Sequence, residues 1–329
     1  MRTSDYRRWS KVIDDLSLDQ LCSTSQRVSN KLADNEVNFI IQKRFSSKPL
    51  CPRCSSKVTS KWGKEYGIQR YRCDDCKRTF NTLTGTPFAR LREKEQWSQY
   101  SKSVEASQSV RKAAKECKIS IPTSFRWRHR WLTALNNLKD RTFAGIVEAD
   151  ETYILESHKG SKTWARSRRG EPTAPPPNRL PRKRGGKAKK RGLSKEQIPV
   201  LVVRDRHGAT TDEVLSDVST AAIKTVLKPV MTGDNILCTD SHSVYRRLSK
   251  QEGFAHQPVN LKSGTRVKLR VYHVQNVNAY HSRFKSWMAP FRGVATKYLS
   301  NYLGWRRFFE RYSNQTTHPS ALSEALCLT

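Results

Sequence analysis

Two pairs of cysteines constrain the fold of this chain more tightly than any other feature of its sequence. The pairs are Cys51 with Cys54 and Cys73 with Cys76. Two Cys-x-x-Cys pairs at this separation are typical of a zinc ribbon, in which four thiolates close a tetrahedron around a structural Zn²⁺. Two disulfides are the alternative, but the chain shows no apolar export signal, so we expect reduced thiols. Residues 46–90 are therefore predicted to form a zinc ribbon, after a helical segment at residues 1–45.

The charge of the chain indicates a polyanionic partner. Its 329 residues include 62 Lys and Arg against 29 Asp and Glu, a formal net charge of +33. Such an excess repels itself unless a polyanion compensates it, and double-stranded DNA is the expected partner. No apolar run approaches the roughly 18 residues of a membrane helix, so we expect a cytoplasmic protein without a membrane partner. A basic structural protein is the alternative, and only a catalytic site would exclude it.

Residues 91–140 are predicted to form a helix-turn-helix-like region that binds DNA. Apolar side chains recur at helical spacing in residues 107–117, and Ser120 can cap a second helix over residues 122–135. The second helix could enter the major groove. A basic helical hairpin that only packs on a neighbour is the alternative. The candidate DNA contacts on this helix are Arg126, Arg128 and Arg130.

Residues 156–196 are predicted to form a mobile basic loop. Between Lys159 and Lys195 the single acidic residue is Glu171, and the stretch is rich in Pro and Gly. This composition cannot bury a core, but it suits contact with the DNA backbone. A solvated linker of little consequence is the alternative. The candidate DNA contacts are Arg182, Lys183, Arg184, Lys189, Lys190 and Arg191.

Carboxylates occur where apolar residues would be expected. Residues 144–155 have the composition of a strand, in which Glu148 and Asp150 share one face. Another predicted strand, residues 235–239, ends at Asp240. Between them we predict strands over residues 198–204 and 209–214 and a helix over residues 220–227. This order matches an RNase H-like core, in which the first and fourth strands are neighbours, so Asp150 and Asp240 should meet.

Two carboxylates that meet in a basic chain indicate a divalent metal. Mg²⁺, or Mn²⁺ in its place, prefers hard oxygen ligands. Paired metals can activate the attacking oxygen and stabilise the leaving oxygen of a phosphodiester. Unrelated surface acids at the two positions are the alternative.

The order of these motifs resembles the insertion-sequence DDE-type transposases that carry an N-terminal zinc ribbon. The resemblance spans roughly residues 45–312. Besides the cysteine pairs it rests on Thr-Gly-Thr-Pro-Phe at residues 84–88, Val-Glu-Ala-Asp-Glu-Thr-Tyr at 147–153, Cys-Thr-Asp at 238–240 and a late helix near His273. It implies that Asp150 and Asp240 coordinate catalytic metal. The family's third position maps to Asn278, and one branch of the family pairs Asn there with a Lys seven residues later, here Lys285.

The third position departs from the acid that the family usually carries. From residue 253 to residue 309 the sequence has no Asp or Glu. Asn offers one neutral carbonyl oxygen, so we expect weaker metal affinity, with Lys285 contacting a phosphate. A degenerate, inactive copy is the alternative. Glu148, Glu151 and Asn276 are further candidates for metal contact.

We therefore expect an α/β protein in which the zinc ribbon and the helix-turn-helix-like region precede an RNase H-like catalytic domain, a mixed five-stranded sheet with flanking helices, at residues 141–312. A C-terminal tail follows at residues 313–329. The resemblance implies a transposase that binds terminal inverted repeats, hydrolyses a phosphodiester at each end and joins the freed 3′-hydroxyl to target DNA, working as a homo-oligomer. A metal-dependent nuclease without strand transfer and a non-enzymatic zinc-ribbon DNA-binding protein are the alternatives.

Overall fold

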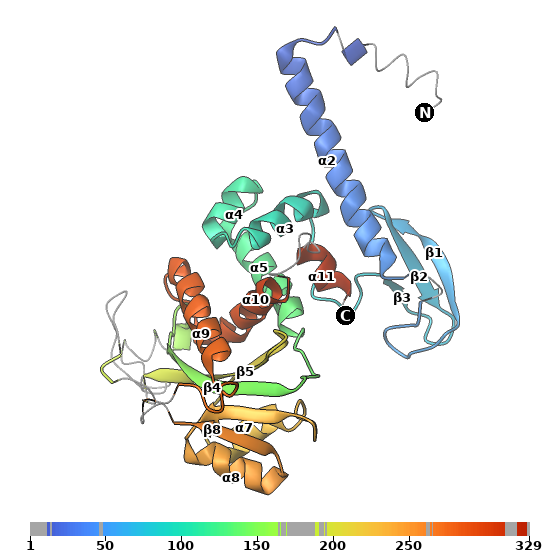
Figure 1. The fold of residues 1–329 in the computed structure, drawn as a ribbon. Coiled ribbons are helices and arrows are strands. Elements are labelled where there is room, and N and C mark those ends of the chain that lie inside the picture. The colour runs from blue at the N-terminus through green and yellow to red at the C-terminus, as the bar shows by residue number, and fades with distance from the viewer. Residues whose placement is uncertain are drawn as a thin grey trace. The chain divides into compact units, whose positions relative to one another are not determined.

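The computed structural model describes residues 12–13, 15–45, 49–163, 165, 169, 188–190, 194, 196–260, 264, 266–312 and 321–327. The chain divides into two compact units (Figure 1). One comprises Met1–Ala134 with Pro319–Thr329, and the other comprises Leu135–His318. No helix in the described ranges is long and apolar enough to cross a membrane.

The first unit begins with a long helix and a small sheet. Helix α2 (Leu18–Lys43) starts with a capping box between Ser17 and Gln20. An antiparallel sheet follows in the order β1 (Thr59–Glu65), β2 (Ile68–Cys73) and β3 (Thr79–Asn81). Tyr66 and Gly67 both have positive φ in the turn between β1 and β2, the geometry that two-residue hairpin turns favour.

Helices form the rest of the first unit. After the 3₁₀ turn η1 (Lys94–Gln96) come α3 (Trp97–Glu105), α4 (Val110–Glu116) and α5 (Ile121–Asn136), with the short α11 (Ala321–Cys327) bound to α3. Ser120 Oγ accepts a hydrogen bond from the Thr123 N–H, as expected of a cap. The predicted helical pair before and after residues 117–120 is therefore present. Its core contains the buried aromatic side chains of Phe88, Trp97, Tyr100, Trp127 and Trp131.

The second unit is built on a five-stranded mixed sheet. Its strands are β4 (Ile146–Leu155), β5 (Gln197–Asp205), β6 (Thr210–Val214), β7 (Ile236–Asp240) and β8 (Ala255–Val259). They lie in the order β6-β5-β4-β7-β8, with β5 antiparallel to β4 and β6 and with β7 parallel to β4 and β8. This is the order of the RNase H-like fold, so the predicted fold class is confirmed. Five strands are present as expected, and the fifth, β8, is the one whose position was not predicted from the sequence.

Helices cover both faces of the sheet (Figure 1). Odd-numbered residues of β4, such as Val147 and Ala149, pack in a core with α7 (Thr220–Leu227) and α8 (Ser243–Glu252). The opposite face packs against α9 (Gln275–Met288) and α10 (Leu299–Arg311), which are connected through the 3₁₀ turns η3 (Ala289–Phe291) and η4 (Thr296–Tyr298). Because side chains alternate along a strand, the even-numbered carboxylates of β4 lie on the face that α9 covers.

Gly304 lets α10 approach the backbone at Asn136. A Cβ atom at residue 304 would lie 2.4 Å from the Asn136 Cα atom and 2.7 Å from its nitrogen. We predict that Gly304→Ala lowers the free energy of unfolding by about 1–3 kcal/mol, because neither backbone can move without disturbing its packing. Gly233→Ala is the matched control, since an added Cβ there meets no atom within 4 Å. Urea unfolding of both variants measures the effect, and equal stabilities would contradict it.

Candidate active site

Two carboxylates lie on neighbouring parallel strands beneath α9. Glu148 pairs with Cys238 in the register of β4 and β7, and two residues further along each strand come Asp150 and Asp240. Cys238 belongs to the core that α9 covers. By strand alternation, Asp150 and Asp240 face the same side. The strand neighbours that the sequence analysis expected are therefore observed.

The environment of Asp150 disfavours its charge. Burial raises the pKa of Asp150 to about 7, and the carboxylates of Glu151 and Asp240 add to the shift, while Lys285 opposes it. Burial also raises the pKa of Glu151. Like charges gathered in a partly buried place repel one another unless a cation compensates them. The donor set of carboxylate oxygens therefore fits a hard divalent cation.

Helix α9 completes a cavity of about 430 Å³ around Asp150. The side chains that it contributes are spaced three, four and seven residues apart, so they project from one face of the helix. Asn278 and Lys285 line this cavity together with Asp150, Glu151, Thr152, Tyr153, His281 and Ser282. The structure thus brings the predicted third-position pair to the same cavity as Asp150.

His281 is a site residue that the sequence analysis missed. Its Nδ1 atom lies 3.8 Å from Asp150 Oδ2. Burial, together with the charge of Lys285, lowers the pKa of His281 to about 4, so its ring is neutral at neutral pH. The sequence spacing could have identified it: His281 lies three residues after Asn278 and four before Lys285, which places all three on one helix face.

Unlike Asp150, Glu148 forms contacts within the fold that connect β4 to α9. Its side chain is fully buried, and its Oε2 atom accepts a hydrogen bond of 3.0 Å from the Val277 N–H in the first turn of α9. Its Oε1 atom lies 2.6 Å from Arg206 Nη1. Burial raises the pKa of Glu148, while the Val277 N–H and Arg206 stabilise its charged form. Glu148 therefore joins β4 to α9, and it does not line the cavity around Asp150.

The structure places the other two candidates for metal contact, Glu151 and Asn276, at different cavities. Glu151 borders the Asp150 cavity and accepts a hydrogen bond from the Tyr245 hydroxyl. Asn276 instead lines a second cavity, which is rich in arginine. Within the described part of the chain, no third His, Cys, Asp or Glu groups with Asp150 and Asp240 at metal-binding distance.

The four cysteines of the first unit form one compact group. Their Sγ atoms all lie within 4.8 Å of one another. Cys51 Sγ is 3.7 Å from Cys76 Sγ, and Cys54 Sγ is 3.6 Å from Cys73 Sγ. Four sulfurs placed 2.3 Å from a tetrahedral Zn²⁺ would be about 3.8 Å apart. The group therefore fits a structural zinc ion closely.

The backbone around the two cysteine pairs follows one pattern. The Cys51 N–H donates to the Ser56 carbonyl, and the Cys73 N–H donates to the Arg78 carbonyl, at 2.9 and 3.0 Å. The residue after each second cysteine, Ser55 or Lys77, has positive φ. The Cys76 N–H lowers the pKa of the Cys73 thiol, whereas the side chain of Cys73 raises the pKa of the Cys54 thiol, as expected for thiols crowded into one group.

The predicted DNA contacts of α5 differ in exposure. Arg126 and Arg130 are exposed, and Arg130 Nη1 donates to the carbonyls of Pro87 and Ala89. Arg128 is fully buried, with its guanidinium carbon 6.0 Å from the centre of the Tyr100 ring. The helix is amphipathic, so the side chain of Arg128 lies on its buried face, whereas those of Arg126 and Arg130 lie on its exposed face. Arg128 is therefore not presented to DNA in this structure.

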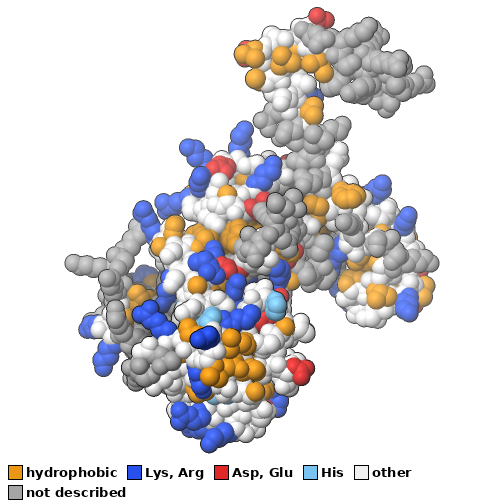
Figure 2. Space-filling model, viewed as in Figure 1, with side chains coloured by type: hydrophobic (Ala, Val, Ile, Leu, Met, Phe, Trp, Pro, Cys, Tyr) orange, Lys and Arg blue, Asp and Glu red, His pale blue; other side chains and the backbone are white. Residues whose placement is uncertain are grey.

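The basic loop is described only in part. Lys189 and Lys190 are exposed. Elsewhere on the surface, Figure 2 shows Lys and Arg side chains gathered over several parts of the visible face, with Asp and Glu more scattered. On α8, Arg246, Arg247 and Lys250 are exposed. The remaining loop candidates lie outside the described residues: Arg182, Lys183, Arg184 and Arg191.

The amino-acid sequence is similar to a known domain family and to a protein of a transposable element. Residues 142–308 match the ISXO2-like transposase domain. An uncharacterised protein in the transposable element ISH50 of Halobacterium salinarum is 27% identical over 271 residues, which cover 81% of this chain and 87% of that protein.

Two solved structures are distantly similar to this chain. A pre-cleavage Mos1 transpososome is 14% identical, with 71% of this chain and 82% of that chain covered and a TM-score of 0.22. A Mos1 strand transfer complex is 15% identical, with 70% and 78% covered and the same TM-score. The domain match alone spans half of the chain and includes Asp150, Asp240, Asn278 and Lys285, and the chain therefore belongs to the family of proteins with an ISXO2-like transposase domain.

Proposed function

We propose that this protein is the DNA transposase of an insertion sequence. The observation that carries the proposal is the cavity in which Asp150, Asn278 and Lys285 meet beside Asp240, within the transposase domain. The protein would bind the element's terminal inverted repeats, cut the DNA at each end and join the freed 3′-hydroxyl to target DNA. Pairing of two ends would require a homo-oligomer.

Both chemical steps are in-line displacements at phosphorus. In the first, the oxygen of water bonds to phosphorus while the bond to the 3′-oxygen breaks, and that oxygen leaves as a 3′-hydroxyl once protonated. In the second, the 3′-hydroxyl oxygen bonds to a phosphorus of the target, and the oxygen that leaves becomes the new hydroxyl end. One site can serve both steps because the reacting groups are the same.

The carboxylates of Asp150 and Asp240 and the side-chain carbonyl of Asn278 would hold Mg²⁺ or Mn²⁺. When bound, the metal supplies activation of the attacking oxygen and compensates charge on the leaving oxygen. The protein's own groups then orient the DNA. Lys285 would contact a phosphate through its ammonium group, and neutral His281 would orient the carboxylate of Asp150.

The first unit would supply structure and DNA contact. We propose that Cys51, Cys54, Cys73 and Cys76 bind a structural Zn²⁺, and that the exposed Arg126 and Arg130 of α5 face DNA. The basic loop, including Lys189 and Lys190, would contact the phosphate backbone without reading sequence.

One observation favours a second candidate function. Because the third position is the neutral Asn278, the protein could be an inactive copy that only binds DNA. A strand-transfer assay distinguishes the two. It uses the full chain, Mg²⁺ and duplexes of the element's own ends, either intact or pre-cut to expose a 3′-hydroxyl. Cleavage and joining support the transposase, cleavage alone indicates a nuclease, and binding without either reaction indicates an inactive copy.

The first prediction for this assay concerns the carboxylates. Asp150→Ala and Asp240→Ala should each lower the cleavage rate by about 10³-fold or more, because each removes a carboxylate that would hold the metal that compensates the charge of the transition state. Both variants should bind DNA normally. Asp234→Ala removes an exposed acid shortly before β7 and serves as the control. Near-normal cleavage by Asp150→Ala or Asp240→Ala would reject the metal assignment.

The same assay separates Asn278 from Lys285. Asn278→Ala should lose activity that higher Mg²⁺ partly restores, because a metal ligand is lost. Lys285→Ala should lose about 10²–10³-fold in rate, and added Mg²⁺ should not rescue it, because the lost partner is a phosphate. Wild-type rates in both variants would show that this face of α9 has no catalytic role.

Zinc content tests the cysteine group. Purified protein should contain one tightly bound zinc per chain by mass spectrometry of metals, and Cys51→Ser should lose it together with thermal stability. Cys22→Ser is the control, since Cys22 is exposed and outside the group. Disulfides in place of zinc would overturn the assignment.

The raised pKa of Asp150 predicts a pH-dependent gain in stability for Asp150→Asn. The folded-state pKa of about 7 exceeds the usual 3.8. The folded state therefore binds the proton more tightly, and without divalent metal this group costs stability as the pH rises toward 7, at about 1.4 kcal/mol per pH unit. The melting temperature of Asp150→Asn minus that of the wild type should grow from about pH 5 to pH 7 and then level off. Added Mg²⁺ should narrow it. A difference that is independent of pH would contradict the prediction.

A further inference from the structure

Helix α9 has a second polar face, which the proposed chemistry does not use. Asn276, Ala279 and Arg283 recur at three and four residues, so they project from one side of the helix. At 100° per residue, this side lies roughly opposite the one that carries Asn278 and Lys285. The three residues line a separate cavity of about 420 Å³.

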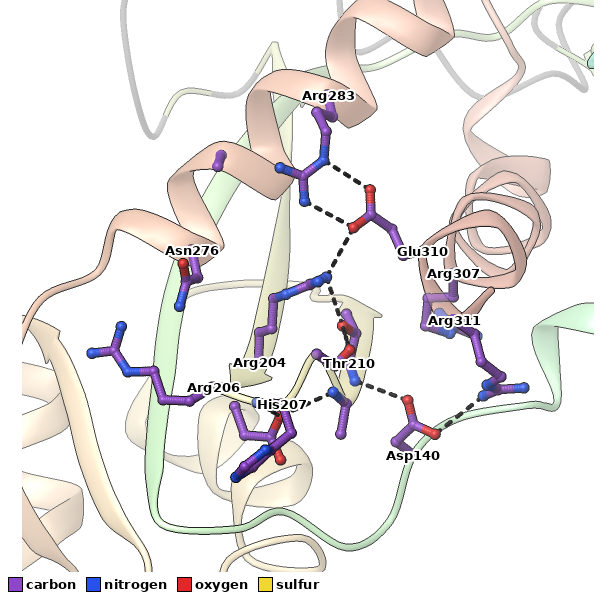
Figure 3. A pocket seen from close by; sticks show the side chains of 14 residues that line it. Asp140, Arg204, Arg206, His207, Thr210, Asn276, Arg283, Arg307, Glu310 and Arg311 are labelled. Carbon is purple, nitrogen blue, oxygen red and sulfur yellow. Dashed lines mark hydrogen bonds and ion pairs between the residues drawn. The ribbon is translucent and has the colours of Figure 1, made fainter. Parts of the chain in front are cut away.

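Arginine dominates the wall of this second cavity, which we call the arginine cavity. Figure 3 shows its side chains converging from α9, from α10, from the β5–β6 hairpin and from the segment before β4. Three acids and five arginines line it, and two of these arginines, Arg206 and Arg307, pair with Glu148 and Asp212, which lie outside the wall. The acids are Asp140, Asp205 and Glu310, and the arginines are Arg204, Arg206, Arg283, Arg307 and Arg311.

The acids of the wall are already engaged. Glu310 accepts two hydrogen bonds of 2.8 Å from Arg283 and one of 3.1 Å from Arg204. Burial opposes its charge, but the hydrogen bonds from Arg283 and from Arg306 outweigh burial and hold the pKa of Glu310 at about 2. The Asp205 carboxylate accepts from the backbone N–H groups of residues 144, 207 and 209. Glu310 therefore holds Arg204 and Arg283 in place, and because these two arginines share one carboxylate, positive charge is in excess beside Arg283.

This geometry suits an anion that enters from solvent. The side chain of Arg283 is 44% exposed, and those of Arg206 and Arg311 are 22% and 25% exposed. A guanidinium group presents a planar set of donors that matches the oxygens of a phosphate. The net charge of the chain makes a polyanion the natural source of such a group.

We propose that the arginine cavity binds a backbone phosphate of the DNA strand whose scissile bond lies in the Asp150 cavity. The inference rests on the proposed function, because it takes DNA as the substrate. The two cavities share α9, whose diameter with side chains is about 10 Å. A single DNA strand carries a phosphate about every 3.4 Å of helix axis, so one strand can reach both faces. A phosphate in the arginine cavity would hold the helix that carries Asn278 and Lys285.

Two matched pairs of variants test the proposal in the full chain. Ala279→Glu places a carboxylate on the exposed wall of the cavity, and Ala279→Gln is its neutral counterpart. Arg283→Gln removes a wall arginine, whereas Arg306→Gln removes an arginine that also binds Glu310 but does not line the cavity. Fluorescence anisotropy with duplex DNA over a NaCl series measures affinity and its salt slope.

We expect Ala279→Glu to weaken DNA binding about tenfold or more, and Ala279→Gln to bind within about twofold of the wild type. Arg283→Gln should reduce the salt slope by about 1, the loss of one phosphate contact. Arg306→Gln should keep the slope. If Ala279→Glu binds like Ala279→Gln, or if Arg283→Gln and Arg306→Gln have equal slopes, the cavity is only a structural brace and the proposal is overturned.

Two further experiments distinguish binding of DNA from binding of a free anion, and failure of this inference from failure of the proposed function. Melting temperatures in inorganic phosphate and in chloride at equal ionic strength test for a free anion; stabilisation by phosphate with no effect of Ala279→Glu on DNA binding would reject DNA as the source. The strand-transfer assay is run on the wild type in parallel. If the wild-type protein cleaves and joins DNA but Ala279→Glu does not weaken DNA binding, this inference alone is overturned. If the wild-type protein neither cleaves nor joins DNA, the proposed function is overturned.

Discussion

The hydrogen bond between Glu148 and the Val277 N–H is the constraint on which the geometry of the candidate site depends. A buried carboxylate is costly unless it is paired and hydrogen-bonded, and here Arg206 and the first turn of α9 meet both needs. The bond fixes where α9 begins along β4. With that start fixed, Asn278 and Lys285 reach the Asp150 cavity by helical periodicity alone.

The same rule separates two structural carboxylates of this sheet from Asp150, the candidate metal ligand. Asp212 is buried, but it forms an ion pair with Arg307 and accepts a hydrogen bond of 3.0 Å from the Tyr280 hydroxyl. Glu148 is compensated in the same manner. Asp150 instead has the carboxylates of Glu151 and Asp240 as neighbours, and among the described residues the charge of Lys285 opposes them. The fold satisfies the first two carboxylates by itself, whereas Asp150 remains short of positive charge, as a metal-binding group should.

Local patterns in the sequence were sufficient for most of the sheet and for part of the site. The predicted strands and the helix over residues 220–227 match β4 to β7 and α7, because their periodicity and their turn residues are local signals. Strand β8 escaped prediction, since Ala255–Val259 contains Pro258 and polar residues and pairs only with β7. The burial of Arg128 and the separation of Asn276 from Asn278 depend on tertiary packing, which one sequence does not display. The division of the first unit into modules stays a prediction.

The absence of acids from residues 253–309 acquires a physical reason if both cavities hold phosphate. Helix α9 presents an apolar face to the sheet and a polar face to each cavity, and a carboxylate on either polar face would repel the DNA strand. An acid in place of Asn278 would also add to the repulsion that already raises the pKa of Asp150. A neutral amide with Lys285 two turns later lowers that cost while keeping one oxygen ligand. On this view the neutral third position and the arginine cavity are two consequences of one requirement, that α9 lie against DNA on both sides.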